Sequence, residues 1–285
     1  MYLQHFGLAQ YPFSLTPNTH YFLKLPSHQQ AFNLLVESLQ DESSFSKITG
    51  EVGTGKTMLC RKTLNALESV KDRYTTAYIP HPIMSEEGIM HAIAEELSIQ
   101  RDASISYYDL LTLITEELTS TARENKSTVL FIDEAQAMPE ETLEAVRLLT
   151  TIDSPSGKPL HVFLFGQAEL NELLNRPILR ELKHNLFSSF ELPALDRAGV
   201  ESYVEHRLVK AGYNGPHMFT TNAIDLLHKS SKGIPRLINI LAHKALMVAY
   251  GKGVQVVNEK HVKHAVRDTE AAKQQKSLGQ RLFAS

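Results

Sequence analysis

Two hydrophobic patterns alternate along residues 30–192. Short runs rich in β-branched and aromatic residues, which favour strands, are separated by longer segments whose apolar residues recur every three or four positions, as on one face of a helix. Five strands are predicted, at 45–49, 74–79, 127–132, 161–165 and 187–192, with helices between them at 58–69, 86–97, 107–123 and 140–150. This alternation predicts an α/β domain whose parallel strands are joined by crossover helices.

The strand pattern stops at Pro193, and the rest of the chain has a helical pattern. Helices are expected at 197–211, 222–231, 235–250 and 259–269. Their lengths are usual for a globular protein. We therefore predict three parts: an α/β domain over 1–192 in which 1–27 form an N-terminal linker, a small all-helical domain over 193–270, and a flexible tail over 271–285.

Composition restricts the class of protein. The 285 residues are 42% hydrophobic, which is enough for a full core, and the single Cys60 excludes an internal disulfide framework. The N-terminus lacks the pattern of a signal peptide, and the apolar runs at 129–132 and 162–165 are too short to span a bilayer. We expect a cytoplasmic protein with no transmembrane segment, which is at most associated with a membrane.

Charge is unevenly distributed. The chain carries a formal net charge of −3, but residues 229–285 hold eleven Lys and Arg against three acidic residues, a net +8. An acidic partner protein, anionic lipid or nucleic acid could meet such a region. An ordinary solvated face explains the charge equally well.

A phosphate-binding motif follows the first predicted strand. Residues 50–57 satisfy G-x-x-x-x-G-K-[ST] and precede a predicted helix, as the phosphate-binding loop of nucleotide-binding proteins requires. Glycines allow backbone N–H groups to surround an anion, and the helix N-terminus adds positive potential. Lys56 would contact the β- and γ-phosphates of ATP, and the Thr57 hydroxyl would bind Mg²⁺. The predicted nucleotide contacts are Gly50, Glu51, Val52, Gly53, Thr54, Gly55, Lys56, Thr57 and Met58.

Two adjacent carboxylates end the third predicted strand. Asp133 and Glu134 follow the buried run Val-Leu-Phe-Ile, and side chains alternate along a strand, so the two acids can take different roles. Asp133 would hold Mg²⁺, as a Walker B acid does, while Glu134 would polarise the water that attacks the γ-phosphate. Favourable charge at a helix N-terminus is the alternative explanation for such a pair.

The combination of these motifs resembles an AAA+ ATPase, a P-loop NTPase with a five-stranded parallel sheet covered by helices on both faces and followed by a small helical lid. Besides the phosphate loop, the sequence contains the segments Phe6-Gly7-Leu8, Tyr11-Pro12-Phe13, Thr16-Pro17, Asp133-Glu134-Ala135-Gln136, Leu164-Phe165-Gly166-Gln167, Arg176-Pro177-Ile178-Leu179-Arg180-Glu181-Leu182 and Gly233-Ile234-Pro235-Arg236-Leu237-Ile238-Asn239. In these segments the sequence resembles the ExeA/GspA group of secretion and pilus ATPases.

The resemblance also implies further site residues. Gln167 occupies the sensor 1 position, where its amide would bind the γ-phosphate or the attacking water. Arg236 matches sensor 2 and would contact the γ-phosphate from the lid. The arginine that reaches a neighbouring subunit's nucleotide would be Arg180 or Arg176, or be absent, because relatives commonly have Gln-Arg-Ile where this chain has His184-Asn185-Leu186. Without such an arginine, turnover would be slow.

The function implied is that of an ATP-binding and ATP-hydrolysing switch with Mg²⁺ as cofactor, slow unless assembled. It would support type IV (MSHA-like) pilus biogenesis or assembly of type II secretion, with inner-membrane assembly proteins as partners and a homo-oligomeric ring as one form. Two alternatives stay open. One is a DNA-binding regulator of the transposition type, although no recognition helix or stacking platform stands out. The other is a nucleotide-gated scaffold with negligible turnover.

Overall fold

The computed structural model describes residues 2–16, 18–41, 43–102, 104–152 and 157–269. Contacts between Cα atoms divide the chain into two compact units. The α/β unit comprises Pro26–Gly50 and Lys56–Leu192, and the helical unit comprises Met1–Leu25, Glu51–Gly55 and Pro193–Ser285. The predicted tail over 271–285 lies outside the described residues. Within the described part of the chain, no helix combines the length and apolar character needed to cross a membrane.

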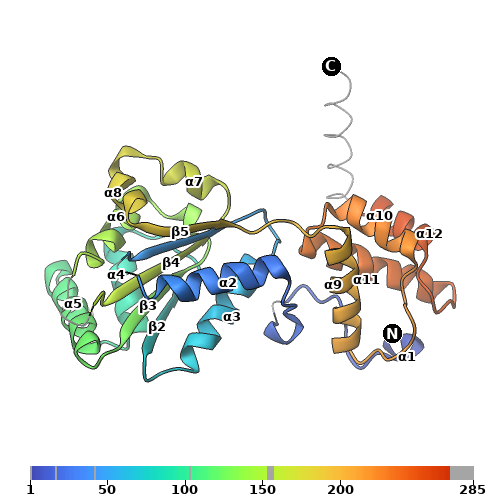
Figure 1. Cartoon of the computed structure of the whole chain (residues 1–285), viewed down its shortest axis with the longest axis horizontal. Coiled ribbons are helices and arrows are strands. Elements are labelled where there is room, and N and C mark those ends of the chain that lie inside the picture. Colours follow the sequence, from blue (N-terminus) through green and yellow to red (C-terminus); the bar gives the residue numbers. More distant parts are fainter. Residues whose placement is uncertain (1, 17, 42, 103, 153–156, 270–285) are drawn as a thin grey trace, which may run out of the picture. The chain divides into compact units, whose positions relative to one another are not determined.

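The α/β unit is built on a five-stranded sheet in which every neighbouring pair is parallel (Figure 1). The strand order is β2-β3-β4-β1-β5. The strands are β1 (Phe45–Thr49), β2 (Tyr74–Ile79), β3 (Ser127–Ile132), β4 (Leu160–Gly166) and β5 (Leu186–Glu191). The predicted fold class is confirmed, and each predicted strand differs from the observed one by at most one residue at either end.

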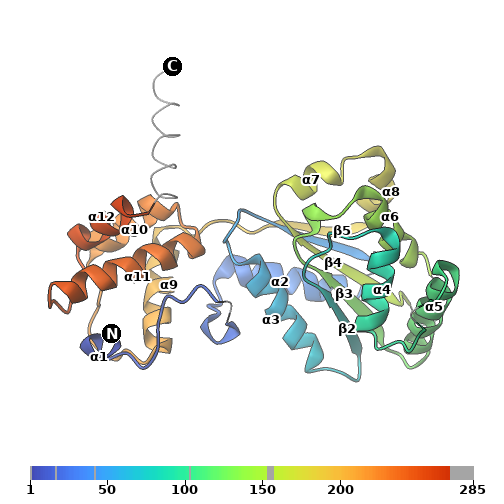
Figure 2. The same cartoon turned by 180° about the vertical axis from the view of Figure 1, so that it is seen from behind.

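Helices cover both faces of this sheet, as parallel strands require. On one face α2 packs against α3, β1 and β5; on the other, α4 packs against α5, α6 and β2 (Figures 1 and 2). The helices of the unit are α2 (Pro26–Ser38), α3 (Lys56–Glu68), α4 (Glu86–Glu96), α5 (Tyr107–Arg123), α6 (Glu140–Leu149), α7 (Glu169–Leu173) and α8 (Arg180–His184), with short 3₁₀ helices η2 (Ala135–Ala137) and η3 (Pro177–Leu179).

Aromatic side chains of two central strands fill the core of the sheet. Phe131 of β3 packs edge to face against Phe163 of β4 at 5.3 Å between ring centroids, and stacks with Phe165 at 6.4 Å. All three are at most 1% exposed. Because the sheet is covered on both sides, β3 and β4 are almost continuously apolar rather than alternating, which explains their strong strand signal.

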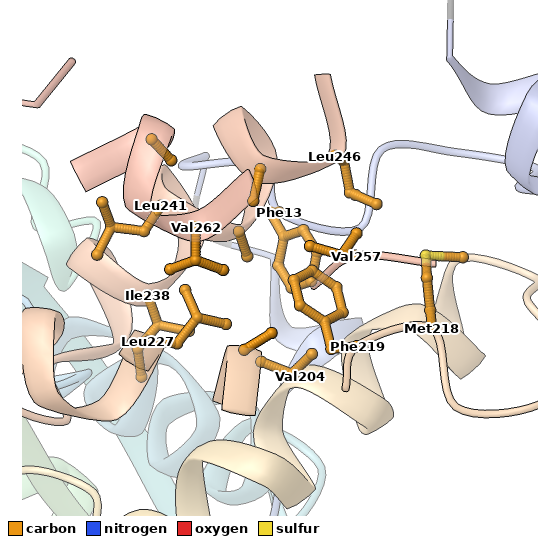
Figure 3. Close-up of a cluster of buried hydrophobic side chains, with 14 of the residues drawn as sticks. Phe13, Val204, Met218, Phe219, Leu227, Ile238, Leu241, Leu246, Val257 and Val262 are labelled. Carbon is orange, nitrogen blue, oxygen red and sulfur yellow. The ribbon is translucent and has the colours of Figure 1, made fainter. Parts of the chain in front are cut away.

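The helical unit has its own core. It contains α1 (Leu3–Phe6), the 3₁₀ helix η1 (Thr19–Tyr21), α9 (Arg197–Lys210), α10 (Thr221–Ser231), α11 (Pro235–Gly251) and α12 (Glu259–Arg267). Figure 3 shows Phe13 and Phe219 at its centre among aliphatic side chains of these helices. Their rings meet edge to face at 6.1 Å. Asp196 caps α9 as its side chain accepts a hydrogen bond from the N–H of Gly199 at 2.7 Å.

The N-terminal residues belong to this helical core. The sequence places 1–27 with the α/β domain as a linker, but Tyr2, Phe6 and Phe13 are each at most 3% exposed within the helical cluster. Arg207 of α9 adds polar contacts: its Nε donates to the carbonyl of Pro12 at 2.5 Å and its guanidinium lies 4.6 Å from the ring of Tyr21. Burial of the aromatic side chains therefore joins residues 2–16 and 18–25 to the helical unit, in contrast to the expected assignment.

Candidate functional site

The predicted site residues follow three adjacent strands. The phosphate loop follows β1, Asp133 and Glu134 follow β3, and Gln167 follows β4. In the sheet, β4 lies between β1 and β3, with Thr49 opposite Gly166 and Ile132 opposite Leu164. Because the strands are parallel, their carboxyl ends share one edge, where ligands of open α/β sheets bind. Three segments distant in sequence therefore meet there.

The phosphate loop curls because its glycines adopt left-handed backbone angles. Gly53 has φ +86° and Gly55 φ +106°, conformations that side chains with a Cβ rarely adopt. Within the loop, the Thr54 hydroxyl donates to the carbonyl of Glu51 at 2.9 Å. Val52 is half exposed at the outer part of the loop, and Met58 lies in the first turn of α3.

Lys56, the first residue of α3, folds back over the loop. Its ammonium Nζ donates to the carbonyl of Gly50 at 2.8 Å, and the side chain is 5% exposed. A buried ammonium that lies against a curled backbone supplies positive charge where a helix N-terminus already points. This arrangement fits a polyphosphate.

Asp133 contacts the loop directly. Its carboxylate accepts a hydrogen bond from the side chain of Thr57, and also one from the N–H of Glu134 at 3.0 Å. Burial raises the pKa of Asp133 above its ordinary value, and the hydrogen bond from Thr57 opposes that rise. A hydroxyl and a buried carboxylate in contact are hard oxygen ligands of the kind that Mg²⁺ prefers. The residues present therefore fit the predicted magnesium site.

Glu134 points toward the end of β4. It has a left-handed backbone with φ +54°, an unusual conformation for a residue with a Cβ. Its Oε2 accepts hydrogen bonds from Nε2 of Gln136 at 2.7 Å and from Nε2 of Gln167 at 3.2 Å. The structure thus brings Glu134 and Gln167 together. Gln136, two residues after Glu134, was not predicted as a site residue, although it belongs to the quoted Asp-Glu-Ala-Gln segment.

Arg236 lies near the phosphate loop within the helical unit. Its backbone N–H, in the first turn of α11, donates to the carbonyl of Gly53 at 3.2 Å. A Cβ on Gly53 would stand 2.6 Å from the Cβ of Arg236, so this approach needs glycine. The backbone of Arg236 thus contacts the backbone of the phosphate loop, while its side chain is exposed.

The structure does not bring Arg180 to these residues. Arg180 begins α8 and, with Arg176, Lys183 and His184, lines a basic cavity of about 320 Å³. Arg176 pairs with Glu140 at 3.5 Å between Nη1 and Oε1. Among the described residues, no hydrogen bond or ion pair links Arg180 to the phosphate loop or to Glu134.

Comparisons with known proteins agree with this architecture. A model of the AAA domain family matches residues 39–174, which contain the phosphate loop and both carboxylates. The matched segment has the P-loop NTPase (AAA+) fold.

The chain is also 38% identical over 253 residues to general secretion pathway protein A of Aeromonas hydrophila. That match covers 89% of this chain and 46% of the relative, so the chain spans about half of the length of the curated protein it matches. The predicted resemblance to AAA+ ATPases of the ExeA/GspA type is confirmed.

Solved structures share the fold at low sequence identity. The ORC2 protein of Aeropyrum pernix superposes with a TM-score of 0.67 at 18% identity, over 90% of this chain and 71% of that one. Cdc6p of Pyrobaculum aerophilum gives 0.72 at 16% identity, over 90% and 70%. The RuvB Holliday junction branch migration motor of Thermotoga maritima gives 0.58 at 16% identity, over 90% and 73%. These likenesses show the AAA+ fold alone.

Proposed function

We propose that this chain binds ATP with Mg²⁺, hydrolyses it, and acts as an ATP-driven switch in the assembly of a secretion or pilus apparatus. The observation that carries the proposal is the hydrogen bond between Thr57 of the phosphate loop and Asp133 at the end of β3, with Glu134 directly beside it. This contact joins the phosphate loop to the pair of carboxylates that would hold Mg²⁺ and activate the attacking water.

Each loop residue has a role that follows from its position. Lys56 would exchange its hydrogen bond with Gly50 for the terminal phosphates, and the backbone N–H groups of the curled loop would hold the remaining phosphate oxygens. Thr57 and Asp133 would hold Mg²⁺. When bound, the ion would neutralise charge on the β- and γ-phosphate oxygens.

Glu134 would accept the proton of the attacking water. Its carboxylate is half-buried, and it accepts hydrogen bonds from the side-chain amides of Gln136 in η2 and of Gln167 after β4. Gln167 reaches the same carboxylate and would hydrogen-bond the water or the γ-phosphate. Arg236 would contact the γ-phosphate and so couple the nucleotide state to the helical unit, since a contact made in one state alone can shift a two-state equilibrium.

The biological role rests on the similarity to general secretion pathway protein A, a protein named for secretion. We propose type II secretion or MSHA-like type IV pilus assembly proteins at the inner membrane as partners, and a cytoplasmic location that is peripheral to that membrane. A homo-oligomer, including a ring, would bring Arg180 or Arg176 of one copy to the nucleotide of the next. Turnover would be slow in the unassembled protein.

The binding step is tested by calorimetry with ATP and Mg²⁺. Wild-type protein should release heat with one site per chain, and Lys56→Ala should abolish binding because the ammonium that neutralises phosphate charge is lost. Lys62→Ala, on the same helix α3, is the matched control and should bind like wild type. Equal affinity in wild type and Lys56→Ala would contradict the proposed phosphate site.

The hydrolysis step is tested by phosphate release. Glu134→Gln should bind ATP normally and lose most of its turnover, by about 10²–10⁴-fold, the usual contribution of a general base. Unchanged turnover would exclude Glu134 as the base.

Specific activity should also rise with protein concentration if an arginine acts between subunits; turnover that stays negligible at every concentration would support the nucleotide-gated scaffold.

A further inference from the structure

The side chain of Gln136 connects the ends of β3 and β4. Its Nε2 donates to Oε2 of Glu134 at 2.7 Å, and its Oε1 accepts from the backbone N–H of Gln167 at 3.0 Å. The Gln167 side chain donates to the same Glu134 oxygen at 3.2 Å. Both polar atoms of the Gln136 amide therefore form hydrogen bonds, the nitrogen with the candidate base Glu134 and the oxygen with the backbone of Gln167.

Local structure determines this position of Gln136. The left-handed backbone of Glu134 turns the chain into η2, and buried Ala135 and Met138 hold η2 against the α/β core. Opposite, Gly166 supplies the space that the amide needs: a Cβ there would lie 3.0 Å from Oε1 of Gln136. The Gln136 amide thus lies between η2 and the end of β4, where Gly166 has no side chain that would clash with it.

The hydrogen bonds also distinguish the two oxygens of Glu134. Oε2 accepts from both Gln136 and Gln167, whereas Oε1 accepts from no protein group among the described residues. Two donors on one oxygen restrict rotation of the carboxylate, because a charged acceptor makes hydrogen bonds of about twice the ordinary strength. The second oxygen is left to act on a water molecule.

We propose that Gln136 is a positioning residue for hydrolysis, which orients the carboxylate of Glu134 and ties it to the end of β4. The inference rests on the proposed role of Glu134 as the base. It assigns a role to the fourth residue of the Asp-Glu-Ala-Gln segment and explains why a long amide follows the base by two positions. Gln136 would act through Glu134 and the backbone of Gln167, with which it forms hydrogen bonds.

A merely structural role would have different consequences. If Gln136 only fastened η2 to β4, its loss would weaken ATP binding and lower the melting temperature. If it positions Glu134, its loss should slow hydrolysis, leave ATP binding unchanged, and have no effect once Glu134 is already disabled. Residues that act through one group are strongly non-additive in this way.

The kinetic test uses Gln136→Met, which keeps the length of the side chain and removes the amide. Single-turnover hydrolysis at saturating ATP and Mg²⁺ should slow about tenfold, which corresponds to about 1.4 kcal/mol of lost transition-state stabilisation. The Kd for ATP should stay within about twofold, a change of about 0.4 kcal/mol. In the Glu134→Gln background, Gln136→Met should cause no further loss. Gln30→Met, at an exposed position of α2, is the matched control.

The contact between Gln136 and Glu134 can also be tested by NMR, without measuring activity. With glutamine side chains labelled with ¹⁵N, the amide signal that disappears in Gln136→Met belongs to Gln136. That signal should shift in Glu134→Ala and stay in place in Gln30→Met; no shift in Glu134→Ala would overturn the contact itself.

The kinetic outcomes separate the two proposals. Wild type that binds ATP without hydrolysing it would overturn the proposed function and the catalytic inference with it. Wild type that hydrolyses ATP while Gln136→Met matches its rate would overturn only the inference. A slowed Gln136→Met that also slows the Glu134→Gln protein, or loses ATP affinity, would show a structural role instead.

Discussion

His161 makes the stability of the α/β unit depend on pH. It lies in β4, is 3% exposed, and contacts the backbone of Ser43. Burial lowers the pKa of His161 from 6.5 to about 4, and the hydrogen bond to Ser43 and the charge of Asp41 only partly oppose this. Since a buried imidazolium is costly, the folded protein holds His161 neutral. We expect His161 to destabilise the protein as it is acidified.

The sign and size follow from proton linkage. Below pH 6.5 the unfolded chain binds a proton that the folded chain does not, so stability is complete above that pH and falls between pH 6.5 and about 4. The difference between the two pKa values corresponds to about 3 kcal/mol in total. At pH 5, about 2 kcal/mol of it should already be lost.

The assay is urea unfolding followed by circular dichroism from pH 7.5 to 4.5. His161→Gln removes the titrating group, so the free energy of unfolding should depend less on pH than in wild type, by about 2 kcal/mol at pH 5 relative to pH 7.5. His81→Gln changes an exposed histidine of the same unit and should retain the wild-type dependence. Parallel curves for wild type and His161→Gln would refute the reasoning.

Two further predictions concern the helical unit. Arg207→Met should destabilise it by about 1–3 kcal/mol, since the carbonyl of buried Pro12 and that of exposed Ser14 lose their donor, and limited proteolysis should cut the N-terminal segment faster; unchanged cleavage would contradict this. Gly233→Ala should lower the melting temperature. The free energy of unfolding should fall by more than the usual penalty for a left-handed residue with a Cβ, about 1–2 kcal/mol, because the new Cβ would lie 1.9 Å from the carbonyl oxygen of Leu195. Gly253→Ala, at φ +69° with open space, is its control and should show only the smaller cost.

Sequence periodicity predicted the α/β strands well but missed the helices α1, α2, α7 and α8. The helix α2 (Pro26–Ser38) buries only His28, Ala31, Leu35 and Ser38, so its apolar stripe is too weak to stand out. The aromatic residues of the N-terminal segment indicate that it is buried, but its neighbours in sequence do not indicate which of the two hydrophobic cores contains it. Phe13 packs against Phe219, a residue of the helical unit that lies far from it in the sequence.

The candidate site divides in the same way. The phosphate loop and the Asp-Glu pair are recognisable in sequence because each depends on neighbouring residues: glycines for the curl, a lysine for charge, a buried strand before the acids. Gln136 could not be chosen from sequence, because its role depends on a hydrogen bond with Gln167, which follows a different strand.

By itself, the sequence determined the alternation of strands and helices, the phosphate loop and the paired acids, since these follow from local periodicity and from residue types at short spacing. Tertiary structure alone decided that β4 stands between β1 and β3, which brings Gln167 to Glu134 and Asp133 to Thr57. It also decided that Tyr2, Phe6, Leu8 and Phe13 complete the helical core. The physical reason is that burial and hydrogen bonding between distant segments depend on strand order and packing, which no short stretch of sequence encodes.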